Sequence, residues 1–129
     1  MTESSSDKLK LCDEKIQKLV CALDKERDGR ICVAVSYRNA EQQEEAFEKG
    51  LSDARWGQSP HNQQPSKAVD LAPLGLDGKI NWGDKFAFLA IVADMKRLAK
   101  EMNIAITCGA DFKKRKGDLG HFELVGWNL

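Results

Sequence analysis

Two histidines and two aspartates are the residues of this chain best suited to metal-dependent chemistry. The chain has only two histidines, His61 and His121, and Asp70 lies between them in the sequence. A catalytic zinc site takes three protein ligands from His, Asp, Glu or Cys and leaves one position open for water. Asp118, three residues before His121, is a carboxylate that could accept a proton from such a water. Together these residues indicate a metal hydrolase.

Each of these residues also has an ordinary structural interpretation. A single histidine beside apolar residues is more often a core or surface residue than a metal ligand. Asp70 alone could belong to a turn or a cap, but its neighbours are apolar, and burial of its charge is costly unless the carboxylate is paired or bound to metal. Asp118 could be a solvated loop carboxylate between Gly117 and Gly120. The three-residue offset from His121 favours the role of a base.

Length and charge limit what else the chain can do. At 129 residues it has the size of one domain, and such a chain buries about two thirds of the surface that its unfolded form exposes. Lysine plus arginine and aspartate plus glutamate each number 20, so the formal net charge is zero. No overall positive field attracts the protein to nucleic acid or to a membrane. We expect a single domain over residues 1–129 that binds no nucleic acid.

The N-terminal residues 1–7 are polar and rich in serine, and we expect them to be disordered. They lack the charged start and the apolar core of a secretory signal. Nowhere do about 18 apolar residues follow one another, so stable membrane insertion is not expected. The sequence therefore predicts a soluble protein that is made in the cytosol.

The four cysteines are not spaced as structural zinc ligands are. Cys12, Cys21, Cys32 and Cys108 include no close C-x-x-C pair. Three of them have apolar neighbours, where a cysteine behaves as a small hydrophobic residue. Because cytosolic chains are kept reduced, we expect buried thiols and no disulfides.

Apolar periodicity predicts the elements that must position the candidate site. The strongest helix pattern runs from about Asp84 to Asn103 and should form the central helix of the core. The other predicted elements are helices over residues 9–23 and 40–49, strands over 31–35, 104–108 and 122–125, a short apolar framework segment over 68–71, and loops over 52–65, 73–84 and 111–120. Asp70 then lies on a framework element, and Arg38 follows the end of a strand, where site residues are common.

Three segments around the candidate ligands form a specific pattern. They are Ser59-Pro60-His61-Asn62, Pro65-Ser66-Lys67-Ala68-Val69-Asp70-Leu71 and Asp118-Leu119-Gly120-His121-Phe122-Glu123-Leu124. The pattern resembles the S-x-H, A-x-D and D/E-x-x-H signature of zinc peptidoglycan peptidases, which include D-alanyl-D-alanine carboxypeptidases and dipeptidases and L-alanyl-D-glutamate endopeptidases. The likeness is closest to small bacteriophage endolysins and runs from about Ile31 to Val125. It implies an α+β fold like that of hedgehog and D-alanyl-D-alanine peptidase domains, with an antiparallel sheet packed against helices.

The resemblance also implies a metal site and a base. It makes His61, Asp70 and His121 the zinc ligands and Asp118 the general base. Ser59, two residues before the first ligand, resembles a family serine that helps to order the substrate or the surroundings of the metal.

Arg38 matches the family arginine in the block Tyr37-Arg38-Asn39-Ala40-Glu41-Gln42-Gln43. The resemblance implies that its guanidinium stabilises the oxyanion or holds the substrate carbonyl, since a fixed cation can face developing negative charge. The alternative is a surface ion pair with Glu41 or Glu45.

The chain departs from the commoner family pattern at two places. The usual spacing is H-x-x-G-x-A-x-D, whereas Asp70 follows His61 by nine positions and the glycine is missing. The loop is therefore two residues longer, and we expect the extra residues to bulge outward, with Pro65 making the bulge rigid. Ala110 and Phe112 stand where relatives often have the second glycine and the tryptophan of G-G-D-W, so the cleft should differ at that end.

Three features have two interpretations each at the level of sequence. Glu123 could orient a ligand histidine through its second ring nitrogen or could face solvent. The basic run over residues 113–116 could be a solvated loop, or it could attract the carboxylates of peptidoglycan stems or anionic outer-membrane components in a salt-dependent way. Trp56 and Trp82 could pack at the rim of the site or form substrate platforms.

The resemblance implies a zinc peptidase that hydrolyses the stem peptide of peptidoglycan, most closely at the L-alanyl-D-glutamate bond. Its alternatives are a D-alanyl-D-alanine carboxypeptidase or dipeptidase and a non-catalytic cell-wall-binding module of the same fold. A phage lysis enzyme of this kind would be a monomer without a separate cell-wall-binding domain. It would be made in the host cytoplasm and would act on the wall after another protein has opened the inner membrane.

Overall fold

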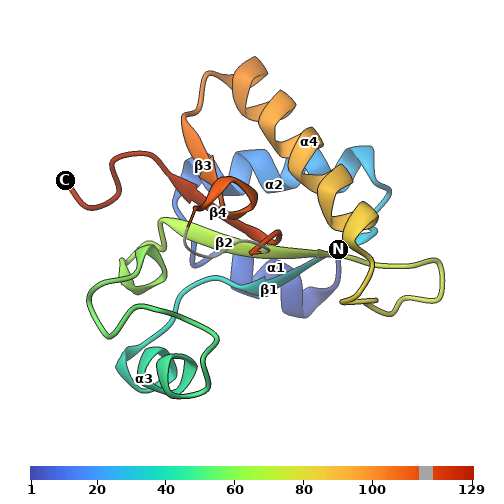
Figure 1. The fold of residues 1–129 in the computed structure, drawn as a ribbon. Helices are drawn as coiled ribbons and strands as arrows, with labels where there is room; N and C mark the ends of the chain where they lie inside the picture. Colours follow the sequence, from blue (N-terminus) through green and yellow to red (C-terminus); the bar gives the residue numbers. More distant parts are fainter. Residues whose placement is uncertain (114–117) are drawn as a thin grey trace.

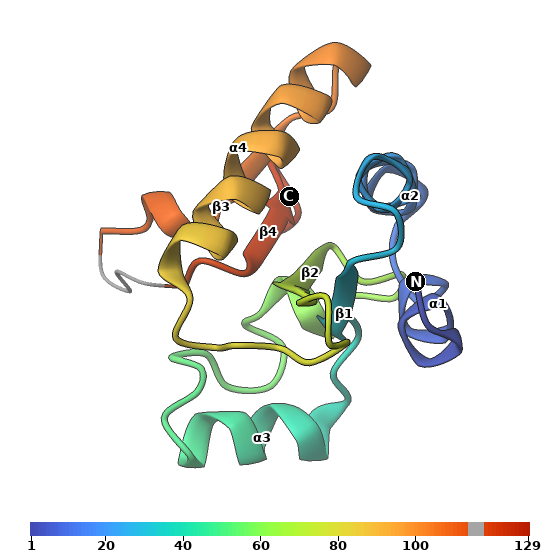
Figure 2. The same cartoon turned by 90° about the vertical axis from the view of Figure 1, so that its right-hand side faces the viewer.

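The computed structural model describes residues 1–113 and 118–129, and its centre is a four-stranded antiparallel sheet (Figure 1). The strand order is β1 (Ile31–Val35), β2 (Ala68–Pro73), β4 (His121–Leu124) and β3 (Ile106–Cys108). Two long helices, α2 (Glu14–Glu26) and α4 (Lys85–Met102), lie side by side and pack on the sheet, while α3 (Ala40–Glu48) lies apart from them (Figure 2). The predicted α+β fold, with an antiparallel sheet against helices, is confirmed.

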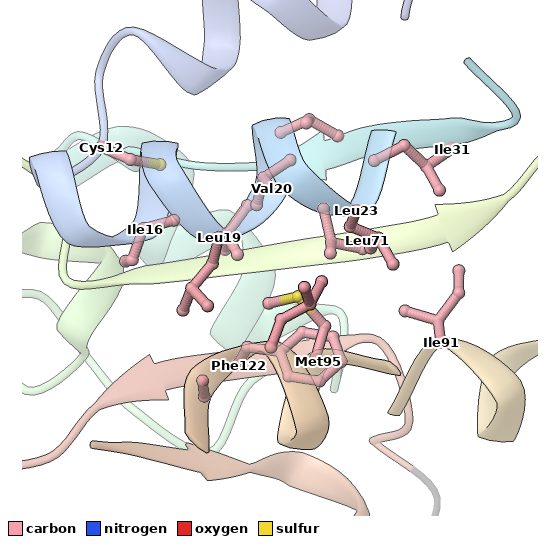
Figure 3. Packing of buried hydrophobic residues seen from close by; sticks show 14 of the residues in the cluster. Cys12, Ile16, Leu19, Val20, Leu23, Ile31, Leu71, Ile91, Met95 and Phe122 are labelled. Carbon is pink, nitrogen blue, oxygen red and sulfur yellow. The ribbon is translucent and has the colours of Figure 1, made fainter. Parts of the chain in front are cut away.

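The core lies between the two long helices and the sheet. Ile16, Leu19, Val20 and Leu23 of α2 and Ile91, Val92, Met95, Leu98 and Ala99 of α4 are buried at the helical spacing that the sequence shows. Side chains of both helices meet Leu71 of β2 and Phe122 of β4 (Figure 3). The prediction that the helix near residues 84–103 is central to the core is confirmed.

The prediction that residues 1–7 are disordered is wrong. Helix α1 (Glu3–Leu9) is capped by Thr2, whose hydroxyl accepts a hydrogen bond from the Ser5 amide. The Ser5 side chain is buried and accepts a hydrogen bond from the Val33 amide of β1 at 3.0 Å. The terminal amine of Met1 pairs with Asp24 at 3.2 Å. The serines therefore satisfy backbone groups of the fold, which the polar composition of the segment does not reveal.

The single helix predicted for residues 9–23 is also divided. Leu9 ends α1, Cys12 forms an isolated bridge with Ser66, and α2 begins after Asp13, whose carboxylate accepts a hydrogen bond from the Lys15 amide. Both residues are buried, as the apolar pattern requires. Leu9 is the last residue of α1, and Cys12 lies in the connection between α1 and α2. The pattern is therefore correct about burial and wrong about continuity.

The cysteines are free thiols, as predicted, but only part of the prediction of burial holds. Cys12 and Cys108 are buried, Cys32 is partly buried and Cys21 is exposed. Burial raises the pKa of Cys12 to about 12 and that of Cys108 to about 11, so these two remain protonated at neutral pH. Among the described residues, no helix is both long enough and apolar enough to cross a membrane.

Strand register brings the candidate site together. Asp70 on β2 pairs with His121 on β4 and, on its other side, with Val35 near the end of β1. A shift in register between Val33 and Val35 precedes the segment that contains Arg38. The sheet thus places one carboxylate between a histidine and the segment with the arginine.

Truncation of a core side chain should destabilise the protein strongly. Leu23→Ala removes a side chain of α2 with 0% exposure, and we expect a loss of about 2 to 5 kcal/mol in the free energy of unfolding. Leu76→Ala, at a side chain with 92% exposure, should change it by less than about 0.5 kcal/mol. Chemical denaturation of both variants checks this, and equal losses would contradict the packing described here.

Candidate metal centre and active site

Three side-chain atoms converge from the turn at residues 60–62, the middle of β2 and the start of β4. His61 Nε2 lies 3.2 Å from Asp70 Oδ1 and 3.3 Å from His121 Nδ1, and His121 Nδ1 lies 3.0 Å from the same oxygen. The sequence predicts these three residues as the ligands of one metal, and the structure brings them together as a group that could hold a metal ion. We call them the triad.

The spacing of the triad fits a small tetrahedral cation. Donor atoms bound to zinc at about 2.0 to 2.1 Å in a tetrahedron lie about 3.3 Å from one another. All three observed separations are close to this value. Two imidazole nitrogens and one carboxylate oxygen suit zinc, and the same donor set suits cobalt and manganese.

Each imidazole is oriented through the nitrogen that does not face the triad. His61 Nδ1 lies 2.6 Å from the Ser36 carbonyl oxygen, which can only accept, so this nitrogen donates to it and Nε2 faces the triad. His121 Nε2 lies 2.8 Å from Glu123 Oε1, and Trp127 Nε1 donates to the other carboxylate oxygen of Glu123 at 2.9 Å. Glu123 therefore orients a candidate ligand, which is the first of its two interpretations from sequence.

The triad is already a charge-paired unit without a metal. Burial would raise the pKa of Asp70, but hydrogen bonds from His121 and His61 outweigh burial and hold this pKa well below its usual value. Burial would lower the pKa of His121, but hydrogen bonds to Asp70 and Glu123 raise it to about 9. At neutral pH an imidazolium at His121 therefore balances the carboxylates around it.

Arg38 and Asp118 border the cleft that the triad opens into. This cleft has a volume of about 260 Å³. An Nη atom of Arg38 lies 3.9 Å from Asp70 Oδ2, so Arg38 faces the oxygen that the histidines do not use. Asp118 lines the same cleft and, by its charge, helps to raise the pKa of His121. The structure thus brings the predicted arginine and the predicted base to the predicted ligands.

Two glycines allow the segment with Asp118 and His121 to lie close to its neighbours. A Cβ atom on Gly109 would lie 2.1 Å from the Asp118 carbonyl oxygen and 2.9 Å from the His121 Cβ. A Cβ atom on Gly120 would lie 2.5 Å from the Leu71 carbonyl oxygen. Neither position has room for a side chain, so both glycines help to set where the base and the ligand lie.

Ser59 caps the short turn that contains His61. Its hydroxyl accepts a hydrogen bond from the His61 amide at 3.2 Å and caps the short 3₁₀ helix η1 (Pro60–Asn62). Ser59 is buried but lines the cleft. The hydrogen bond of the Ser59 hydroxyl thus lies in the turn that holds His61.

A buried amide network was not assigned any role from sequence. Gln43 of α3 has 0% exposure and donates to the Ala54 carbonyl at 2.7 Å, and Asn62 donates to the side-chain oxygen of Gln43 at 3.1 Å. The side-chain oxygen of Asn62 accepts from the amides of Gly57 and Ser59. Gln43 and Asn62 both occur in the segments that resemble the peptidase family. The sequence alone does not show that their side chains are hydrogen-bonded to each other.

The lengthened loop leaves the ligands in place. Residues 64 and 65 are exposed, which agrees with the expected outward bulge, whereas Ser66 is buried and donates to the carbonyls of Ser36 and Ala68. The Lys67 amide donates to the Pro60 carbonyl across the base of the loop. Of the two tryptophans in question, Trp82 lines an apolar extension of the cleft, and Trp56 is exposed beside Glu44.

Phe112 occupies the end of the cleft where the sequence departs from G-G-D-W. Its ring lies 5.5 Å from the ring of His121 and lines the cleft. Lys113 is exposed, and the rest of the basic run lies outside the described residues.

Comparison with known proteins identifies the family of this chain. A family model for the phage L-alanyl-D-glutamate peptidase matches residues 1–125. The chain belongs to this family. The L-alanyl-D-glutamate peptidase of Escherichia phage T5 is 37% identical to it over 68 residues, which cover 45% of this chain and 49% of that protein. The chain thus matches about half the length of this curated relative.

A solved structure supports the same fold. The crystal structure of the Serratia marcescens L-Ala D-Glu endopeptidase ChiX superposes with a TM-score of 0.79 and covers 96% of this chain and 88% of that chain. The sequences are 22% identical, so this likeness concerns the fold alone. The family resemblance seen in the sequence is confirmed by the family model and the curated relative.

Metal binding by this phage L-alanyl-D-glutamate peptidase family member should release a proton. At pH 7.5, below the pKa of about 9, His121 carries a proton on Nδ1 that must leave before this nitrogen can bind a cation. We expect release of about one proton per zinc ion, falling as the pH rises through 9. Calorimetric titration in buffers of different ionisation enthalpy measures it.

A control variant separates the role of Glu123 from that of surface charge. Glu123→Gln should reduce proton release at pH 7.5 and weaken zinc binding about 10- to 100-fold, because the carboxylate that orients His121 is lost. Glu101→Gln, at an exposed glutamate that pairs with Arg97, should leave both unchanged. Zinc binding without proton release in the unmodified protein would contradict the charge-paired triad.

Addition of one methyl group at Gly109 should disturb the site. Gly109→Ala must displace the Asp118 carbonyl, so we expect a loss of about 1 to 3 kcal/mol in stability together with weaker zinc binding. Gly83→Ala is the matched control, because a Cβ atom there meets only Asn81 at 3.5 Å. Thermal unfolding and zinc titration of both variants test this, and an unaffected Gly109→Ala protein would show that the approach is not tight.

Proposed function

We propose that this chain is a zinc-dependent peptidase that hydrolyses the L-alanyl-D-glutamate bond of peptidoglycan stem peptides and acts as a phage lysis enzyme. The single observation that best supports the chemistry is the triad, whose three donor atoms have the mutual spacing of a tetrahedral zinc site and border an open cleft. Membership of the phage L-alanyl-D-glutamate peptidase family supports the choice of bond.

His61, Asp70 and His121 would hold the zinc ion. When bound, zinc acts as a Lewis acid that makes water more acidic and polarises a carbonyl group. The chain's own contribution begins with the orientation of both imidazoles, since the Ser36 carbonyl and Glu123 fix which nitrogen faces the cleft. This preorganisation lowers the cost of assembling the site.

Asp118 is proposed as the general base and acid. It borders the cleft close enough to His121 to influence the charge of that imidazole, so its carboxylate can reach a water molecule in the same cleft. It would take a proton from this water as the water attacks the scissile carbonyl carbon, and then give the proton to the leaving amine. The peptide bond breaks without a covalent bond between substrate and protein.

Arg38 is proposed to stabilise the charge that develops on the carbonyl oxygen. Its amide donates to the His61 carbonyl at 2.8 Å, and its own carbonyl accepts from Asn62, so its backbone is fixed to the turn that holds the ligand. A guanidinium held at the edge of the cleft can donate to the oxyanion without rearrangement. Ser59 supports this arrangement through the turn and is proposed to contact the substrate from the cleft wall.

The setting of this activity follows from the same proposal. The partner is the peptidoglycan stem peptide, and the protein would act as a monomer of one domain over residues 1–129. A phage lysis enzyme of this type would be made in the host cytoplasm and would reach the wall after the inner membrane is permeabilised.

Defined muropeptides test the proposal directly. Zinc-loaded protein should cut stem peptides between L-alanine and D-glutamate, with the products identified by mass spectrometry. Release of terminal D-alanine would favour the carboxypeptidase instead, and binding to intact stem peptides without any cleavage would favour a non-catalytic wall-binding module.

Asp118→Asn should separate metal binding from turnover. The variant should retain zinc, because Asp118 is not in the triad, but should lose about 10²- to 10⁴-fold in kcat. Asp111→Asn, at an exposed aspartate paired with Lys96, is the matched control and should keep its activity. An Asp118→Asn protein with undiminished kcat would remove this residue from the proposed role.

A further inference from the structure

The cleft extends in two directions from the triad. Both parts are lined by Arg38, Leu51, Asp70 and Asp118. The first part, here called the loop arm, lies between the 52–60 segment and Phe112 and has a volume of about 260 Å³. The second part, here called the helix arm, lies between the end of β1, the middle of β2 and the start of α4 and has a volume of about 540 Å³. A peptide bond held at the triad could therefore extend into one arm on each side.

The helix arm is apolar with a cation at its border. Trp82 is 65% exposed, and its ring lies 6.0 Å from that of the buried Phe88 at 30°, so the two rings form a continuous apolar wall. Lys85, the first residue of α4, is exposed. Apart from Arg38, Asp70 and Asp118, which line both arms, it is the only charged residue among the described residues that line this arm.

The loop arm offers no such additional cation. Beyond the shared residues its described lining includes two carboxylates, Asp53 and Glu123, together with the two histidines of the triad, and no further lysine or arginine. An anionic group on the substrate would therefore find an additional lysine, Lys85, only among the described residues of the helix arm. The two arms therefore distinguish the two sides of a substrate whose charge is uneven.

We propose that the helix arm binds the D-glutamyl side of the scissile bond, with the Lys85 ammonium paired to the free α-carboxylate and Trp82 against the methylene groups. This inference rests on the proposed function, because it takes the L-alanyl-D-glutamate bond as the substrate. In the stem peptide the D-glutamyl residue continues through its γ-carboxyl, which leaves the α-carboxylate as an anion beside the bond that is cut. The uncharged L-alanyl side then lies in the loop arm.

The inference makes Lys85 a specificity-determining residue. Some peptidoglycans have this α-carboxylate converted to an amide, which removes the charge that Lys85 would recognise. The zinc-loaded protein should therefore prefer acid over amide. Because the pair is exposed, we expect the preference to be about fivefold and to decrease at high salt.

Binding of product-like peptides tests this apart from turnover. The probes are γ-D-glutamyl-L-lysine and its α-amide, which lack the L-alanyl bond and are not cut. Nuclear magnetic resonance titration of the zinc-loaded protein should show tighter binding of the acid, and Lys85→Gln should make the two affinities equal. Lys79→Gln is the matched control, since Lys79 is an exposed lysine of the preceding loop that does not line the helix arm. Trp82→Ala should weaken binding of acid and amide alike.

Hydrolysis of the same two peptides, each extended by an N-terminal L-alanyl residue, separates this inference from the proposed function. If the unmodified protein cuts the acid and Lys85→Gln retains its preference for acid over amide, the assignment of Lys85 is overturned while the proposed function stands. If the unmodified zinc-loaded protein cuts neither peptide, the proposed function fails and this inference fails with it. Loss of the preference in Lys85→Gln alone supports the inference.

Discussion

The convergence of two imidazoles on one carboxylate oxygen is the constraint on which the site depends. Asp70 Oδ1 lies within 3.2 Å of a nitrogen from His61 and within 3.0 Å of one from His121. In the metal-free protein the proton of His121 balances this carboxylate, and in the loaded protein a cation would take the same place. The donor atoms can therefore be arranged before a metal arrives, because proton and metal satisfy the same charges in turn.

The arrangement is imposed by elements that are far apart in the sequence. Antiparallel pairing sets Asp70 opposite His121, and the backbone hydrogen bond from Arg38 to His61 joins the end of β1 to the histidine turn. Gly109 then lets the chain before His121 lie against the end of β3 without a side chain in between. Since each contact is made by backbone, the geometry depends more on register and close approach than on the flexible ends of side chains.

Residue type and the presence of only two histidines point to the triad and Asp118, and the motifs that resemble the peptidase family strengthen this assignment and add Arg38. From sequence, Glu123 could either orient a ligand histidine or face solvent, and the last strand is predicted over residues 122–125. With the strand beginning at His121, residues 121 and 123 point to the same face, and the carboxylate must neighbour the imidazole. The Ser36 carbonyl that orients His61 could not be predicted at all, since every residue has a carbonyl and only the fold selects one.

The lengthened loop between the first two ligands contacts the connection between α1 and α2. The lengthened loop between the first two ligands is anchored at Ser66, whose amide donates to the Leu11 carbonyl and whose carbonyl accepts from the Asp13 amide. These partners lie in the connection between α1 and α2, which the sequence predicts as continuous helix. Ser66 Oγ also donates to the Ser36 carbonyl, the acceptor that orients His61. The N-terminal segment thus supports the metal site through the loop, which explains how a longer spacing preserves the ligand geometry.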